Sequence, residues 1–392
     1  MPGPEGDDPA QDVEGGVRHV ALFLADLHGG GAERMMVVLA NGLAGRGVRV
    51  DLVLADASGP YLREVSHEVR VLPLRGGGVV RNLPALTGYL RRERPQVLVS
   101  TLPHTSVVAL IARALADRRL PVVIREANTP QARPQHWNSP KSRLAAWAMR
   151  RLYRRADGVI AVSAGVADAV VDVMGVPRDR IATLYNPVVT SEMQAFATED
   201  PGHPWLGADV PVVLAVGSLT PRKDYPTLVR AFARLRSRMP ARLLVLGEGP
   251  ERPRIAALAE ELGVAADVDL AGFQANPYAY MARADVFAAA SRLEGLPGAL
   301  VQALACGCPA VATDCPSGPA EVLEGGALGE LVPVGDADAL ADALERTLQR
   351  PPDRARLKES TRKYDADLVI EAYRAYLSRL SRGPVPGASR PG

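Results

Sequence analysis

The feature of this sequence that most constrains its fold is a series of short apolar runs, each of strand length, separated by segments with helical periodicity. Six runs in the first half and five in the second fit this description: residues 19–24, 49–54, 69–72, 96–100, 121–124 and 158–162, then 212–216, 242–246, 268–270, 285–289 and 309–313. Strands that alternate with helices predict parallel sheets covered by helices on both faces. The predicted fold class is therefore α/β, with Rossmann-like doubly wound sheets.

The length of the chain indicates two such domains. Its 392 residues exceed what one hydrophobic core usually holds. The first series of runs is followed by Asn186-Pro187, and then by a polar stretch with Pro and Gly over residues 190–209. We predict one domain over residues 17–190 and a second over residues 191–364, with the ligand in the cleft between them.

The two ends of the sequence are expected to be disordered tails, residues 1–16 and 381–392. The first tail is acidic and lacks the basic start and apolar core of a signal peptide. No apolar run approaches the ~20 residues that cross a bilayer. Three cysteines in so long a chain make no disulfide framework, which favours a reducing compartment. These features predict a cytoplasmic protein.

Charge is unevenly distributed between the two halves. Residues 17–190 contain 24 Lys and Arg against 13 Asp and Glu, whereas residues 191–392 contain 22 against 26. A basic first half favours an anionic surface or substrate. The alternative is that these arginines are simply solvated.

A basic helix is predicted over residues 139–155, with Ser139 as its N-cap and Pro140 at its first position. An apolar face is expected from Leu144, Trp147, Ala148 and Leu152. The positive charges come from Lys141, Arg143, Arg150, Arg151, Arg154 and Arg155. Such a helix either lies on an anionic membrane surface, with its Trp at the interface, or packs on the core with a solvated basic face. The sequence leaves both interpretations open.

Polar loops follow several strands of the first half. The loop 26–34, Asp-Leu-His-Gly-Gly-Gly-Ala-Glu-Arg, links a strand to a helix and can bring backbone N–H groups close to a phosphate, although a plain tight turn also uses glycine. It is no dinucleotide fingerprint, because Arg34 stands at the third glycine position. Loops 101–105 and 125–128 are expected to face the same crevice. His104 would then contact substrate as a hydrogen-bonding group or proton acceptor, unless it is an ordinary surface histidine.

The loops of the second half suit an anionic ligand. Arg222 and Lys223 follow the strand 212–216 and match a pyrophosphate. Glu294 lies in a Gly- and Pro-rich turn before a helix over 299–305. The next loop, 314–319, leads into another helix, so two helix N-termini meet at one sheet edge.

Cys306, Cys308 and Cys315 raise the question of a zinc site. Two of them flank a helix stop beside a buried strand, and no histidine lies nearby in sequence. Packing is therefore the favoured interpretation, and no metal site is predicted.

The order of these motifs resembles the retaining glycosyltransferases of family 4 over roughly residues 17–380. The motifs are GGGAER (29–34), NP (186–187), GSLTPRKD (217–224), GEGP (247–250), GFQ (272–274) and LEGLPGALVQALACGCPAVATDCPSGPAE (293–321). The resemblance implies a GT-B fold, with a nucleotide-sugar donor on the C-terminal domain and the acceptor on the N-terminal one. It also implies that a last helix, 365–380, crosses back to the first domain.

The resemblance implies a role for each matched residue. Glu294 would approach the donor sugar hydroxyls, while Arg222 and Lys223 would neutralise the departing diphosphate. The family has a second glutamate eight positions after the first, facing the ribose, where this chain has Gln302. An amide still hydrogen-bonds a ribose hydroxyl, but any mechanism that needs a charge at this position is in doubt. The other donor-binding positions would be Gly30, Gly31, Gly217, Gly249, Phe273, Gln274, Leu296, Pro297 and Gly298.

The implied reaction is transfer with retention of anomeric configuration, in which the leaving phosphate helps to deprotonate the acceptor, without a metal or a resident cofactor. Glu294 as a covalent nucleophile is the less favoured mechanism. The style of residues 303–321 resembles bacterial enzymes that build surface polysaccharide or glycolipid from UDP-hexose or UDP-N-acetylhexosamine, on a glycan or lipid-linked acceptor. No nucleic-acid partner is implied. If residues 139–155 form the membrane-surface helix rather than a solvated one, the protein would lie on the inner face of the cytoplasmic membrane; otherwise it would be cytoplasmic.

Two alternatives stay open at this point. A nucleotide-sugar epimerase or hydrolase would use the same fold, and a non-catalytic nucleotide-sugar-binding protein would explain Gln302.

Overall fold

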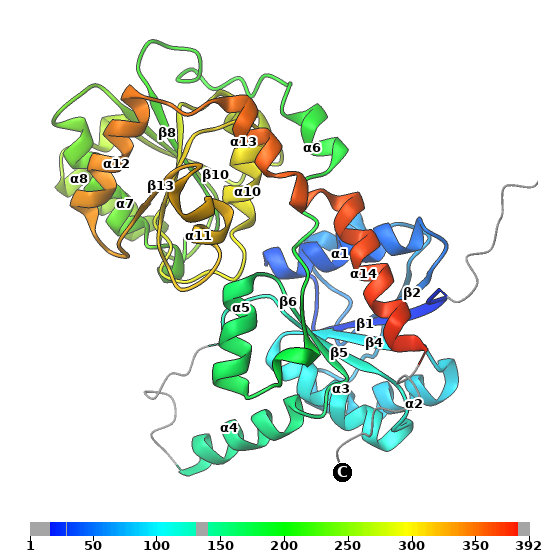
Figure 1. The fold of residues 1–392 in the computed structure, drawn as a ribbon. Coiled ribbons are helices and arrows are strands. Elements are labelled where there is room, and N and C mark those ends of the chain that lie inside the picture. The colour runs from blue at the N-terminus through cyan, green and yellow to red at the C-terminus, as the bar shows by residue number, and fades with distance from the viewer. Residues whose placement is uncertain (1–15, 29, 131–139, 383–392) are drawn as a thin grey trace, which may run out of the picture.

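The computed structural model describes residues 16–28, 30–130 and 140–382, with the backbone alone over 140–146. The predicted tails fall almost wholly outside these residues, as does Ser139. Two parallel sheets form the two domains (Figure 1), and the expected α/β fold is confirmed. Residues 17–190 and 191–364 remain the predicted domain limits.

The first domain is built on a seven-stranded sheet of order β3-β2-β1-β4-β5-β6-β7. Its strands are β1 (His19–Leu24), β2 (Arg49–Leu54), β3 (Arg70–Pro73), β4 (Val97–Thr101), β5 (Val122–Glu126), β6 (Gly158–Ala161) and β7 (Ile181–Thr183). Its helices are α1 (Gly31–Ala44), α2 (Leu83–Glu93), α3 (Pro103–Ala116), α4 (Pro140–Tyr153) and α5 (Ala164–Ala169), which a π-helical turn over Val170–Met174 extends.

The second domain is built on a six-stranded sheet of order β10-β9-β8-β11-β12-β13. Its strands are β8 (Val212–Val216), β9 (Arg242–Leu246), β10 (Val268–Gly272), β11 (Val286–Ala289), β12 (Ala310–Thr313) and β13 (Glu330–Val332). Its helices are α7 (Tyr225–Arg236), α8 (Arg252–Glu261), α9 (Pro277–Arg283), α10 (Gly298–Ala305), α11 (Pro319–Val322), α12 (Ala337–Gln349) and α13 (Arg354–Ser360), and α6 (Ser191–Phe196) precedes its first strand.

Strands β7 and β13 were not predicted from the sequence. Each is only three residues long and closes one end of its sheet, and each has a single fully buried residue. The central strands are buried on both faces and therefore read as continuous apolar runs. A short edge strand gives no such signal.

Helix α14 (Ala366–Ser381) returns the chain to the first domain and packs along α1 (Figure 1). Gly42 permits this contact, because a Cβ there would lie 2.2 Å from Cδ1 of Ile370. The two chain crossings between the domains also pair with each other: Val188 and Val189 donate to the carbonyl of Tyr364 at 3.1 and 3.0 Å. The domains are thus joined by a double connection.

Arg125 reinforces this connection, which corrects its predicted place in a loop facing the cleft. It lies in β5 and is 1% exposed. Its Nε donates to the hydroxyl of Tyr373 in α14 at 3.2 Å, and its Nη2 donates to Oδ1 of Asn186 in the first crossing. Glu126 is buried too, where it accepts a hydrogen bond from Tyr153 at 2.7 Å, and burial raises its pKa to about 7.

The predicted apolar face of the basic helix is also partly wrong. Tyr153 is buried, and Met149 and Leu152 pack against the core, but Trp147 is 61% exposed. Figure 1 shows α4 at the edge of the first domain. Among the described residues, no helix is both long and apolar enough to cross a membrane.

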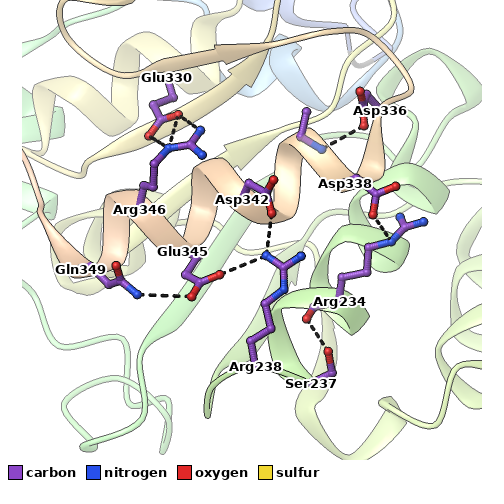
Figure 2. Close-up of polar contacts among 11 residues, drawn as sticks. Arg234, Ser237, Arg238, Glu330, Asp336, Asp338, Asp342, Glu345, Arg346 and Gln349 are labelled. Carbon is purple, nitrogen blue, oxygen red and sulfur yellow. Dashed lines mark hydrogen bonds and ion pairs between the residues drawn. The ribbon is translucent and has the colours of Figure 1, made fainter.

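Helices α7 and α12 cover one face of the second sheet side by side. Leu340, Ala341 and Leu344 of α12 are buried, and Figure 2 shows the ion pairs that flank this seam. Arg234 pairs with Asp338 at 2.6 Å, and Arg238 reaches both Asp342 and Glu345 at 2.6 and 3.1 Å. Because solvent screens such pairs, the buried aliphatic residues dominate the stability of this contact.

A network of ion pairs and hydrogen bonds surrounds Asp51, near the amino-terminal ends of β1, β2 and β3. Asp51 is fully buried and accepts hydrogen bonds from His19 at 2.9 Å, from Tyr89 at 2.7 Å and from Arg70 at 2.9 and 2.6 Å. Burial alone would raise the pKa of Asp51, but these partners outweigh it and hold that pKa well below its ordinary range.

We predict that Asp51→Asn lowers the free energy of unfolding by about 2 kcal/mol at pH 7, because His19, Tyr89 and the half-exposed Arg70 lose the charged acceptor that they share. A carboxyl with a depressed folded pKa stabilises the fold above its unfolded pKa of about 3.9 and loses this contribution as the pH falls below that value. The deficit of the variant should therefore shrink in acid. Urea denaturation at pH 7 and in acid measures it, with Asp56→Asn, at an exposed position, as the control.

Candidate functional site

The predicted site lies where four loops of the second domain meet at the carboxyl edge of its sheet. These loops follow β8, β9, β11 and β12. The backbone N–H of Arg292 donates to the carbonyl of Arg222 at 2.8 Å, and that of Leu219 to the carbonyl of Glu248 at 2.9 Å. Successive loops therefore brace one another.

Glycines make this close approach possible. A Cβ at Gly247 would lie 2.0 Å from the carbonyl oxygen of Gly217, and one at Gly249 would lie 2.4 Å from that of Leu219. Gly247 also has a φ of +142°, which disfavours a side chain. Gly247 and Gly249 thus have a structural reason to be glycine.

Lys223 and Glu294 form a buried ion pair at this edge. Their Nζ and Oε1 atoms are 2.6 Å apart, and their side chains are 18% and 6% exposed. Burial by itself would raise the pKa of Glu294, but Lys223 and, more weakly, Arg222 outweigh it and lower that pKa. The pair lines a small pocket together with Tyr225 and Ser291.

The turn that carries Arg222 and Lys223 is held by Asp224. This residue has φ +47° and ψ +45°, a left-handed conformation that aspartate tolerates. Its carboxylate accepts from Thr227 at 2.8 Å and pairs with Arg292 at 2.9 Å. Arg222 is exposed on the other side of the turn, where its Nη1 donates to Oδ1 of Asn128 at 3.0 Å.

Residues of the first domain touch this site directly. Asn128 pairs with Gly295 in an isolated antiparallel bridge, and Thr129 donates to the carbonyl of Glu294 at 2.6 Å. Ser163 donates to the carbonyl of Gly295 at 2.8 Å. The strand-end rule singled out Asn128 but missed Thr129 and Ser163, although both follow strands of the first sheet.

A second contact between the domains involves Glu321 at the start of α11. Its carboxylate accepts from the backbone N–H of Ala164 at 2.8 Å and from the hydroxyl of Tyr185 at 2.7 Å. Burial, and then the hydrogen bond to Glu321, raises the pKa of Tyr185 above its ordinary value. The sequence gave no reason to single out Glu321 beyond its place in a family motif.

The position predicted to face the ribose, Gln302, lies near α1 of the first domain. Gln302 donates from Nε2 to the hydroxyl of Tyr278 at 3.4 Å. Tyr278 is buried, which raises its pKa, and Arg34 of α1 partly offsets this effect, so the two residues are neighbours. Gly30 is the N-cap of α1 and Gly31 is its first residue, so both lie about one turn from Arg34.

The residues expected at the base lie after β10. Phe273 is 77% exposed, and Gln274 donates to the carbonyl of Ala271 at 2.9 Å. The remaining predicted positions lead into α10: Leu296 precedes the helix, Pro297 is its N-cap and Gly298 is its first residue.

His104 does not lie in a loop as predicted, because α3 already begins at Pro103. It occupies the first turn of this helix and is exposed. Within the described parts of the chain, no hydrogen bond or ion pair joins it to the other predicted site residues. Its catalytic role stays a prediction.

The three cysteines are all buried and free. Burial raises the pKa of Cys306 and of Cys315 to about 11. Over residues 16–28, 30–130 and 140–382, no group of three or more His, Cys, Asp or Glu side chains is placed to hold a metal ion.

Comparisons with known proteins agree on one family. The model described as "Glycosyltransferase Family 4" matches residues 29–192, and "Glycosyl transferases group 1" matches residues 203–364. The chain is 31% identical over 336 residues to the lipopolysaccharide core biosynthesis glycosyltransferase LpsE of Rhizobium meliloti, covering 84% of this chain and 89% of that protein.

A second relative is an N-acetylgalactosaminyltransferase of Campylobacter jejuni that acts on N-acetylgalactosamine-N,N'-diacetylbacillosaminyl-diphospho-undecaprenol. It is 28% identical over 351 residues, covering 85% of this chain and 91% of that protein. Among solved structures, a glycosyltransferase from Rickettsia africae has a TM-score of 0.77 at 14% identity, covering 94% of this chain and 100% of that one. HepE of Anabaena in complex with UDP has a TM-score of 0.73 at 20% identity, covering 92% and 100%.

We predict that Lys223→Met makes the protein less stable by about 3 kcal/mol at pH 7, because Glu294 loses its main counter-charge while it stays buried. Burial then dominates and raises the pKa of Glu294. A buried acid with a raised pKa destabilises the fold at neutral pH and less so as it becomes protonated, so the deficit should shrink between pH 7 and pH ~4.

Thermal and urea midpoints across this pH range measure the effect. The double variant Lys223→Met/Glu294→Gln removes the charge and should recover most of the lost stability at pH 7. A deficit that is independent of pH, and unchanged in the double variant, would contradict the ion pair.

Proposed function

Because the chain belongs to the family 4 glycosyltransferases of the GT-B fold, we propose that it transfers a hexose or N-acetylhexosamine from a UDP-sugar with retention of anomeric configuration. The acceptor is a glycan or lipid-linked glycan of bacterial surface polysaccharide or glycolipid synthesis. The observation that carries the proposal is the Lys223–Glu294 pair at the carboxyl edge of the second sheet, with Arg222 beside it.

Arg222 and Lys223 stabilise the charge that develops on the departing diphosphate. Both lie on one turn after β8, Lys223 partly buried and Arg222 exposed toward the cleft. Cations fixed in a partly dehydrated site act more strongly than cations in water and need no reorganisation during the reaction. The amino terminus of α10 adds the positive end of a helix dipole. These groups supply the charge that a metal ion would otherwise supply, so we propose that transfer needs no metal.

Glu294 orients the donor sugar. Its lowered pKa keeps it ionised at neutral pH, so it accepts hydrogen bonds from sugar hydroxyls. Gln302 accepts from the ribose hydroxyls through its amide carbonyl oxygen, since its amide nitrogen donates to Tyr278. A negative charge at position 302 is not required in this arrangement.

The bond changes balance without an enzymic nucleophile. The bond between C1 of the sugar and the β-phosphate oxygen breaks, and the acceptor oxygen bonds to C1 on the same face. The acceptor proton passes to the departing phosphate oxygen. The tight pairing of Glu294 with Lys223 favours a positioning role over covalent attack, because a carboxylate held by an ammonium is a weaker nucleophile.

The UDP donor and the acceptor class rest on similar proteins. HepE of Anabaena was solved in complex with UDP-glucose, and the relatives in R. meliloti and C. jejuni are named for lipopolysaccharide core and diphospho-undecaprenol substrates. A lipid-linked acceptor suits a protein that rests on a membrane. We propose that α4 provides this contact through exposed Trp147 and Arg151, together with exposed Arg155 two residues past the end of the helix.

Transfer can be tested with a panel of UDP-sugars and a bacterial extract of lipid-linked oligosaccharides, with release of UDP as the readout. We expect acceptor-dependent release that persists in EDTA and falls by at least about 100-fold in Glu294→Ala, as for other groups that act on the transition state. NMR of the product reports the anomeric configuration.

Three outcomes would contradict this function. Epimerisation of the sugar without UDP release would indicate an epimerase, and release that ignores the acceptor would indicate a hydrolase. Full transfer by Glu294→Ala would place the site elsewhere.

The membrane contact predicts that the protein co-sediments with vesicles of anionic phospholipid, and that Trp147→Ala/Arg151→Gln/Arg155→Gln reduces this binding by about 10-fold or more. Arg75→Gln/Arg81→Gln removes two exposed positive charges that follow β3, at the far end of the first sheet, and is the matched control. An equal loss of vesicle binding in both variants would mean that the net charge of the domain, and not α4, causes the binding.

A further inference from the structure

The turn that carries Glu294 is held by the opposite domain through its backbone. The carbonyl of Glu294 accepts from Thr129 at 2.6 Å, and the carbonyl of Gly295 accepts from Ser163 at 2.8 Å. Both donors belong to the first domain, at the ends of β5 and β6. Ser317 of the second domain lies against the same group, with its Oγ 2.8 Å from the carbonyl oxygen of Glu294 and within hydrogen-bond reach of Thr129 Oγ1. Its single proton serves one of these two oxygens at a time, while Thr129 donates to Glu294. The Glu294 backbone is therefore shared between the two domains.

The contact is too close to be an accidental meeting of two surfaces. A Cβ at Gly295 would lie 2.2 Å from the carbonyl oxygen of Ala127. A Cβ at Gly165 would lie 2.6 Å from the Cβ of Ser317 and 3.1 Å from the Cα of Ser317. Glycine on either side of the interface thus removes the side chains that would hold the domains apart.

The side chain of Glu294 depends on this arrangement. Its carboxylate is fixed by Lys223, but its Cα and the peptide planes on its carboxyl side are fixed by the hydroxyls of Thr129, Ser317 and Ser163. A shift of the turn by a fraction of an ångström moves the carboxylate relative to the donor cations. Rates are sensitive to displacements of this size.

We propose that Thr129 and Ser163 are positioning residues, which set the backbone of Glu294 for transfer from across the domain interface. The inference rests on the proposed role of Glu294. It assigns to the acceptor domain a share in arranging the donor site, so that the carboxylate is in place when the two domains are in contact. Most of the proposed donor-binding groups belong to the second domain, so we expect UDP binding to depend little on the hydroxyls of Thr129 and Ser163.

Thr129→Val tests the proposal because valine has nearly the shape of threonine but no hydroxyl. The probes are UDP, for binding, and the UDP-sugar that the wild type consumes, for transfer. We expect kcat to fall about 10-fold, the equivalent of one buried hydrogen bond of roughly 1.4 kcal/mol, while the Kd for UDP stays within about 2-fold. Thr129→Ser keeps the hydroxyl and should restore kcat to within about 3-fold of the wild type.

Thr87→Val is the matched control. Thr87 donates to the carbonyl of Leu83 within α2, and this bond lies outside the interface. Its loss should leave kcat unchanged. A wild-type kcat in Thr129→Val, or an equal fall in Thr129→Ser, would overturn the positioning role of that hydroxyl.

Gly165→Ala gives an independent test that does not depend on how Thr129→Val folds. Alanine is more favourable than glycine within a helix, so the substitution should not destabilise α5 itself. Its methyl group keeps Ser317 at a distance, and we expect kcat to fall by at least about 10-fold with an unchanged Kd for UDP. Gly88→Ala in α2, where the added Cβ meets only the end of the flexible Arg92 side chain, is the control.

The outcomes separate this inference from the proposed function. If Glu294→Ala is inactive while Thr129→Val and Gly165→Ala both turn over like the wild type, the positioning role is wrong and the function stands. If Glu294→Ala is fully active, the function is wrong, and with it the reason to position this turn.

Discussion

The buried pair of Lys223 and Glu294 is the interaction on which the rest of the site depends. A carboxylate with 6% of its side chain exposed persists as an ion only if a cation neutralises it. The two residues come from loops after β8 and β11, so these loops must meet at one edge of the sheet. Parallel strands deliver their carboxyl ends to the same edge, and loop glycines such as Gly247 allow the backbones to approach closely. The remaining site residues are arranged around this contact.

A second buried polar residue, Arg125, connects the two domains and does not take part in the proposed site. Arg125, which is almost completely buried, connects β5 to Tyr373 of α14 and to Asn186 at the first crossing between the domains. The crossings also share backbone hydrogen bonds between Val188, Val189 and Tyr364. A double connection of this kind restricts how the domains can move, so the two faces of the cleft meet in a defined register. The contact of Thr129 with Glu294 requires that register.

Much of the fold could be predicted from the sequence, because central strands of a parallel sheet are buried on both faces and appear as continuous apolar runs. β1, β2, β8 and β9 begin and end where the runs begin and end. The site was predicted less completely. The strand-end rule identifies the edge at which loops converge, but successive residues of a strand point to opposite faces. Arg125 and Glu126 were expected in the cleft because the apolar run ends at Ile124. The strand instead continues through both residues, and both side chains are buried.

The sequence by itself determined the two parallel sheets, the edge at which the loops of the proposed site gather, and the residue types on these loops that would suit a diphosphate and a sugar. These properties are local, since periodicity, turn glycines and paired cations are visible within a few residues. Only the tertiary structure decided that Lys223 pairs with Glu294, and that Thr129 holds the backbone of a residue 165 positions away. Contacts over such separations depend on how two folded domains are oriented. That orientation is set by packing and by the double connection between the domains, which no short stretch of sequence encodes.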